Sequence, residues 1–152
     1  MRKQGYHLRR AQRPANPMGD LALLNRRTRA PLDDTQLRDL GLAYLDALRG
    51  MTTGHGTEVL WNTLACSINV AMVLAEIGVM PQGLQVINAG QDALIRVRAH
   101  AQNTGEWTLG IHAFAIECAF KFHDQQLKEA GKGQIIAALE EVHRRIDAGQ
   151  HL

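Results

Sequence analysis

Two positions near the C-terminal end carry side chains that can bind metals and transfer protons. Glu140 and His143 are three residues apart, a spacing that puts both on one face of a helix. Di-iron carboxylate bundles need two such Glu-x-x-His pairs and a further Glu from each of two other helices. The chain has one such pair, so we expect a solvated acidic face with a peripheral histidine and no metal.

The dipeptide His123-Asp124 also occurs at the centre of helical metal-dependent phosphohydrolases. Such a site needs a preceding histidine and a distant aspartate, for which His100 or His112 and Asp147 are the candidates. With seven histidines and fifteen acidic residues in a chain of 152, such combinations arise easily by chance. We therefore expect His123 and Asp124 to lie at the exposed edge of their helix, with a phosphohydrolase kept as a remote alternative.

Nucleophilic catalysis has no recognisable motif in this sequence. Cys66 and Cys118 both lie in apolar stretches, which predicts small buried hydrophobic residues in a reducing compartment. Their spacing does not exclude a disulfide between them. No glycine-rich loop carries the lysine that a phosphate-binding motif requires. The sequence predicts no catalytic residue and no cofactor.

The basic residues are concentrated at the N-terminal end. Residues 1–31 contain eight basic residues and one acidic residue, a net charge of +7, whereas the remaining residues have a net charge of −5. Arginine binds phosphate and carboxylate groups bidentately. Two interpretations stay open: the segment binds nucleic acid or an acidic protein surface, or it packs on the acidic remainder of its own chain. The candidate partner-binding residues are Arg9, Arg10, Arg13, Arg26, Arg27 and Arg29.

The rest of the chain, residues 32–152, reads as one helical domain behind this Pro-interrupted arm of residues 1–31. Apolar residues recur with helical spacing in five segments, which predicts an all-α, bundle-like fold. The second segment is apolar nearly all round, so we expect it to be the central helix. The expected helices span about 33–49, 57–78, 81–102, 108–131 and 133–148.

Several details of this bundle follow from single residues. Residues 111–122 also alternate as a strand would, but Ala, Glu and Lys are depleted in strands and favour a helix. Gly41 predicts a close helix crossing, and the short link at residues 131–133 predicts that the last two helices form an antiparallel hairpin. Residues 51–56 are expected to form a loop. The expected inward-facing residues include Leu45, Leu84, Ile111 and Ile146.

Two stretches resemble a loose group of small helical proteins encoded in prophages and mobile elements of proteobacteria. They are LRRAQRPANPMG at residues 8–19 and WNTLACSINVAMVLAE at residues 61–76. The resemblance covers about the first half of the chain and includes no catalytic motif. It implies a phage or mobile-element origin, where small helical proteins commonly bind and disable or redirect a host complex.

These observations predict a non-enzymatic binding protein, an accessory or anti-defence factor that occludes a host protein or nucleoprotein complex. The alternative is a sequence-tolerant DNA- or RNA-binding protein that uses the basic arm. The basic start of the chain is followed by no apolar signal segment, and polar residues interrupt the apolar run at 59–79. We therefore expect a cytoplasmic protein without a membrane partner, in which a homo-oligomer remains open.

Overall fold

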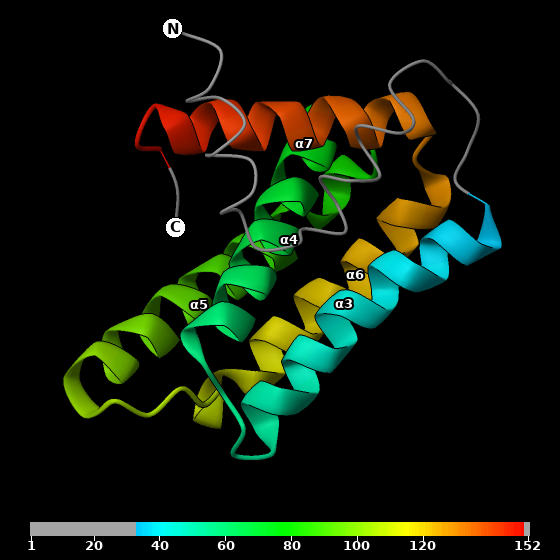
Figure 1. The fold of residues 1–152 in the computed structure, drawn as a ribbon. Coiled ribbons are helices and arrows are strands. Elements are labelled where there is room, and N and C mark those ends of the chain that lie inside the picture. Colours follow the sequence, from blue (N-terminus) through cyan, green and yellow to red (C-terminus); the bar gives the residue numbers. More distant parts are fainter. Residues whose placement is uncertain (1–32, 151–152) are drawn as a thin grey trace, which may run out of the picture.

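The structure is a computed structural model that describes residues 33–150. The described residues form five α-helices joined by turns, two of which are short 3-10 helices, and contain no β-strand (Figure 1). This arrangement confirms the all-α class, and residues 111–122 are helical. The helices are α3 (Asp34–Thr52), α4 (Glu58–Glu76), α5 (Leu84–Thr104), α6 (Ala113–Glu129) and α7 (Lys132–Asp147), and the 3-10 turns are η1 (Pro81–Gly83) and η2 (Gly110–His112).

Helix α4 is the centre of the molecule, as its sequence predicts. Helices α3, α5, α6 and α7 all pack against it, and ten of its residues are buried. The hydroxyl of Thr57 caps its first turn by accepting a hydrogen bond from the Leu60 amide at 3.2 Å. Its length and apolar composition would also suit a membrane span, as those of a buried core helix often do.

The close helix crossing lies between α5 and α6, not at Gly41. A Cβ atom at Gly90 would come within 2.5 Å of the Ala119 Cβ, so only glycine lets the two helices approach this closely. A Cβ at Gly41 would find its nearest neighbour, the Tyr44 hydroxyl, at an ordinary 3.7 Å. The prediction for Gly41 was therefore wrong.

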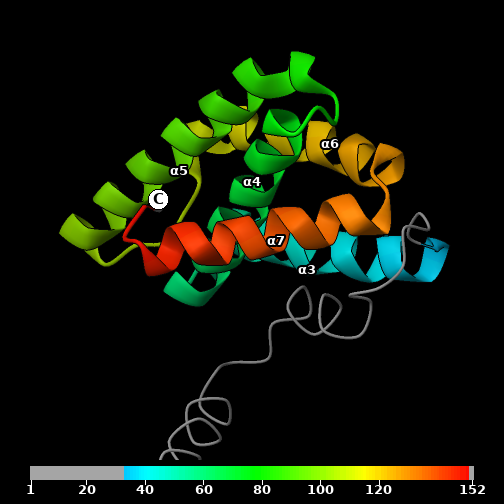
Figure 2. The same ribbon diagram turned by 90° about the horizontal axis from the view of Figure 1, so that it is seen from above.

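Helix α7 does not form the predicted hairpin with α6. The chain becomes extended at Ala130 and Gly131, which turns α7 away so that it crosses α4 (Figures 1 and 2). The physical reason is burial: the apolar face of α7 needs a surface, and α6 already packs against α3, α4 and α5. The residues that α7 buries are Ile135, Ala138, Leu139 and Val142.

Some expected core residues lie on the surface. Leu45 and Leu84 are exposed, and Ile111 is 94% exposed. Leu45 lies outside the face that α3 buries through Tyr44, Ala47 and Met51, and Leu84 is the first residue of α5. Ile111 lies in the 3-10 turn η2 ahead of α6, and α6 itself buries Ile116, Phe120 and Leu127. Helix α3 continues through Met51, which was expected in a loop and is fully buried.

Candidate functional site

An open groove of about 440 Å³ lies between α4, α5 and α7. This volume falls within the range of about 300–1,000 Å³ that is usual for ligand pockets. Helix α4 contributes four lining residues, α5 three and α7 three, with one more just beyond α7. The lining residues are Asn69, Met72, Val73, Glu76, Gln91, Ile95, Arg98, Val142, Arg145, Ile146 and Gln150.

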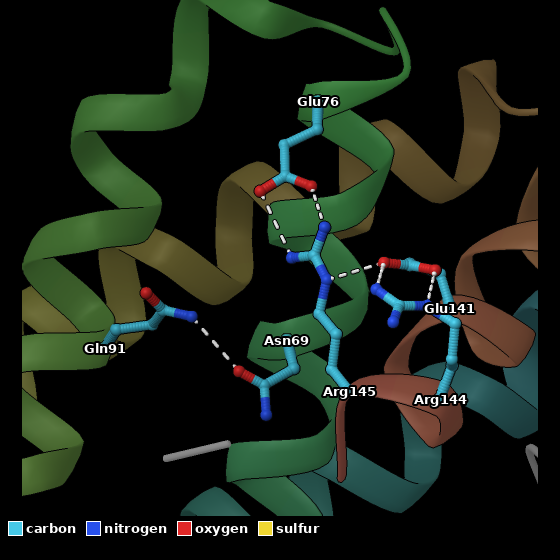
Figure 3. Close-up of polar contacts among 6 residues, drawn as sticks. All are labelled: Asn69, Glu76, Gln91, Glu141, Arg144 and Arg145. Atoms are coloured by element: carbon cyan, nitrogen blue, oxygen red, sulfur yellow. Dashed lines mark hydrogen bonds and ion pairs between the residues drawn. The ribbon is translucent and has the colours of Figure 1, made fainter. Parts of the chain in front are cut away.

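The charged residues on one side of the groove neutralise one another. The two terminal nitrogens of Arg145 donate to the Glu76 carboxylate, at 3.2 and 2.5 Å, and its Nε donates to Glu141 at 2.8 Å. Arg144 also binds Glu141, and the two guanidinium groups lower the pKa of that carboxyl to about 2. The hydrogen bonds that Arg145 donates to Glu76 and Glu141 in turn raise the pKa of its guanidinium group. This network ties the last residue of α4 to α7 (Figure 3).

Two neutral amides face each other across the α4–α5 side of the groove. The Nε2 of Gln91 donates to the Oδ1 of Asn69 at 3.1 Å. Within the described part of the chain, this bond leaves the Nδ2 of Asn69 and the Oε1 of Gln91 without another partner. The pair therefore keeps one hydrogen-bond donor and one acceptor free, and these two atoms point in different directions (Figure 3).

Another polar residue of the groove, Arg98, lies against an aromatic ring. Its guanidinium carbon lies 5.0 Å from the centre of the Trp61 ring, a distance typical of a cation–π contact. The Trp61 ring is itself buried, and its Nε1 donates to the Leu94 carbonyl oxygen at 2.9 Å. Arg98 is thus positioned by the core beneath it.

The remaining lining is apolar and partly uncovered. Ile95 on α5 and Ile146 on α7 are 41% and 39% exposed, from opposite walls of the groove. Ile146 was expected to face the core, but it lies at the rim because α7 crosses α4 and does not lie along α6. Met72 and Val73 from α4 and Val142 from α7 complete this apolar surface.

The residues His123 and Asp124 do not form an exposed edge, which corrects the expectation from the sequence. His123 is completely buried beside the Tyr44 and Phe120 rings, and this burial lowers its pKa to about 4. Its Nδ1 lies 3.2 Å from the Gln126 Oε1, and its Nε2 has no hydrogen-bond partner in the described structure. Asp124 accepts a hydrogen bond from the Tyr44 hydroxyl at 3.0 Å and pairs with Lys128.

The part of the chain that the structure describes does not bring together a set of metal ligands. Across residues 33–150 no group of three or more His, Cys, Asp or Glu side chains could hold a metal ion, so His100, His112 and Asp147 do not join His123. Glu140 is exposed and His143 is partly buried.

The two cysteines do not form a disulfide with each other. Cys66 and Cys118 are free thiols, partly rather than fully buried, and burial raises the pKa of the Cys66 thiol. The candidate partner-binding residues Arg9, Arg10, Arg13, Arg26, Arg27 and Arg29 lie outside the described residues.

The groove was not predicted from the sequence, because its lining residues come from three helices with no common local pattern. Chemically it offers a neutral donor–acceptor pair, a self-neutralised ion-pair network and an aliphatic lining. Such a surface can hold a ligand by hydrogen bonds and apolar contact. Comparison with protein-family models, with curated proteins and with solved structures finds no match to this chain.

Proposed function

We propose that this chain is a non-enzymatic binding protein that holds part of a partner protein in the groove between α4, α5 and α7. The observation that supports this most directly is the state of the polar groups there. Glu76 is bound by both terminal nitrogens of Arg145, whereas the amides of Asn69 and Gln91 keep a donor and an acceptor unused. A carboxylate whose two oxygens are already bound by an arginine is not available to a substrate, and free amides are typical recognition groups.

The partner class in this proposal is a host protein or nucleoprotein complex, which the protein would occlude as an accessory or anti-defence factor of a phage or mobile element. That origin rests on the resemblance of residues 8–19 and 61–76. The arginines of residues 1–31 would add charge to the contact, because guanidinium groups bind carboxylates and phosphates bidentately.

Direct binding of DNA or RNA is the second candidate, supported by the net charge of +7 in residues 1–31. The other residues have a net charge of −5, so a polyanion would have to bind the arm and avoid the helical body. This geometry would make affinity fall steeply with salt as counterions are released. A protein partner in the groove would show a much weaker salt dependence of the dissociation rate.

The test is a pull-down of tagged full-length protein from a proteobacterial lysate, with and without nuclease and at low and high salt. We expect a specific protein to be retained after nuclease treatment, and to be lost when Ile95→Glu places a charge in the groove. A matched control, Ile111→Glu, changes an exposed isoleucine outside the groove. Capture that disappears with nuclease would overturn the proposal in favour of nucleic-acid binding.

A further inference from the structure

Helix α3 lies at the outside of the bundle and leaves an apolar strip uncovered (Figures 1 and 2). It packs on α4 and α6 and buries Tyr44, Ala47 and Met51. Leu42 and Leu45 lie outside this buried face, three residues apart, and are 48% and 55% exposed. Side chains at this spacing are neighbours on a helix surface. The two leucines therefore form a continuous apolar surface that another segment can cover.

Carboxylates lie at both ends of this apolar strip. Asp39 is three residues before Leu42 and Asp46 is four residues after it, so both lie next to it on the helix surface. Asp39 is paired with Arg38 at a distance of 3.9 Å, and its side chain is still 65% exposed. In the part of the chain that the structure describes, Asp46 has no ion pair. Both carboxylates are open to a cationic segment.

The charge of α3 distinguishes it from the other helices around α4. With Asp33 directly ahead of it, α3 carries four carboxylates and two arginines. Helix α6 carries three carboxylates and two lysines, α7 three charges of each sign, and α5 one carboxylate and two arginines. Among these four helices, α3 is therefore the one that attracts a basic segment most strongly.

The chain ahead of α3 has the complementary composition. Residues 21–29, LALLNRRTR, contain three leucines followed by three arginines, and they lie outside the described residues. Leu24 is ten residues ahead of Asp34, a length of chain that can span about 33 Å. Leu42 is eight residues beyond Asp34, or about 12 Å along the helix axis. The leucines of the segment can therefore reach the leucines of α3.

From these observations we infer that residues 21–29 dock on the outer face of α3. The chain reverses direction between the segment and α3, so the arginines, which are nearer to the reversal, meet Asp34 and Asp39. The leucines of the segment then cover Leu42 and Leu45. Guanidinium groups bind carboxylates bidentately, which adds direction to the apolar contact.

This contact goes beyond the proposed function and does not involve the groove. Of the two interpretations of the basic arm, it assigns residues 21–29 to the protein's own helical body. Arg9, Arg10 and Arg13 precede the docked segment in the sequence. They stay available to the partner of the proposed function.

The experiment measures backbone order in the full-length, ¹⁵N-labelled protein by NMR relaxation. We expect order parameters of about 0.8 across residues 21–29, close to the value of about 0.85 for rigid backbone. The double variant Leu42→Ser, Leu45→Ser should lower them below about 0.6, the range of flexible chain. In wild type, nuclear Overhauser contacts between the methyl groups of Leu24 and those of Leu42 or Leu45 should identify the docking face.

A matched control is Val86→Ser, which changes a 38% exposed aliphatic residue on α5 and should leave the order of residues 21–29 unchanged. Thermal melts by circular dichroism should show that every variant stays folded. The double variant Asp34→Asn, Asp39→Asn should lower the order parameters less than the leucine replacements do, because the apolar contact remains. Unchanged values in that variant would overturn the pairing with the arginines.

Three results would overturn the docking itself. Order parameters below about 0.6 in wild type would show that residues 21–29 do not dock. Values that survive the loss of both leucines would place the segment on another surface. Order that rises with protein concentration would place the segment on a second copy of the chain.

Discussion

Two polar clusters lie on different sides of α4, and their surroundings differ. Toward α6, Gln126 donates through Nε2 to the carbonyl oxygens of Ala71 and Val79, at 3.1 and 3.2 Å, beside the buried His123. Toward α5 and α7, Asn69 and Gln91 share one hydrogen bond next to the Arg145–Glu76 ion pair. The first cluster is closed to solvent, and the second is open to it.

The comparison shows how burial decides what a polar residue can do. The amide of Gln126 is used by backbone carbonyls, so it joins α6 to α4 at Ala71 and to the turn that follows α4 at Val79. An amide in that position stabilises the fold and cannot meet a ligand. The amides in the groove have spare capacity and solvent access, and for that reason the candidate site lies there.

The largest expected effect concerns the buried face of α4. Leu64→Ala or Ile68→Ala removes a fully buried aliphatic side chain, and should lower the free energy of unfolding by about 2–5 kcal/mol. Urea denaturation measures this loss. Val59→Ala on the same helix, where the side chain is 67% exposed, serves as the control and should change little. Similar losses for all three variants would mean that α4 is not the core helix.

The second prediction is that the free energy of unfolding depends on pH through His123, which lies in the cluster closed to solvent. Burial lowers the pKa of His123 from 6.5 to about 4, so below pH 6.5 the unfolded chain takes up a proton that the folded chain does not. The free energy of unfolding should therefore fall as the pH drops from about 6.5 to 4, by a total of about 3 kcal/mol from this group.

His123→Leu isolates that contribution. The difference in unfolding free energy between wild type and variant should change by this amount across the same pH range, because other titrating groups are common to both proteins. Parallel stability curves for the two proteins, measured by urea unfolding at several pH values, would show that His123 is not protected from protonation.

Replacing one amide side chain in each cluster by leucine should have a smaller effect on stability. Gln126→Leu removes the donor that two carbonyl oxygens share, and should cost about 1–3 kcal/mol. Gln91→Leu breaks one bond in a partly exposed groove and should stay within about 0.5 kcal/mol of wild type. Thermal melts of both variants compare the two losses of stability. Equal losses would mean that the closed and the open cluster contribute alike to the fold.

The smallest effect should come from the ion pair at the groove. Arg145→Met should lower stability by less than about 1 kcal/mol, since the partners are roughly one-third exposed and solvent screens their attraction. The difference from wild type should shrink further at high salt. A loss of several kcal/mol in chemical denaturation would mean that the network holds α7 in place and belongs with the buried cluster.

The all-α class, the number of helices in the described region and the central place of α4 could all be predicted from the sequence. These follow from local periodicity and from an apolar surface on every side of one segment, both of which a single chain displays. The sequence does not show which face of each of the other helices is buried. Each residue turns a helix by about 100°, so the predicted inner face depends on where the helix begins. Ile111 was expected inward, but α6 begins only at Ala113 and buries Ile116 and Phe120.

The direction of α7, the burial of His123 and the groove depend on how the helices pack, which no local sequence pattern shows. A short link limits the distance between two helices but leaves their angle to the surface available for burial, so α7 crosses α4. His123 reads as a surface residue in sequence because its partners Tyr44 and Phe120 come together only when α3 packs on α6. The groove likewise joins Asn69, Gln91 and Ile146, which no local pattern connects, because it forms where three helices fail to close over one another.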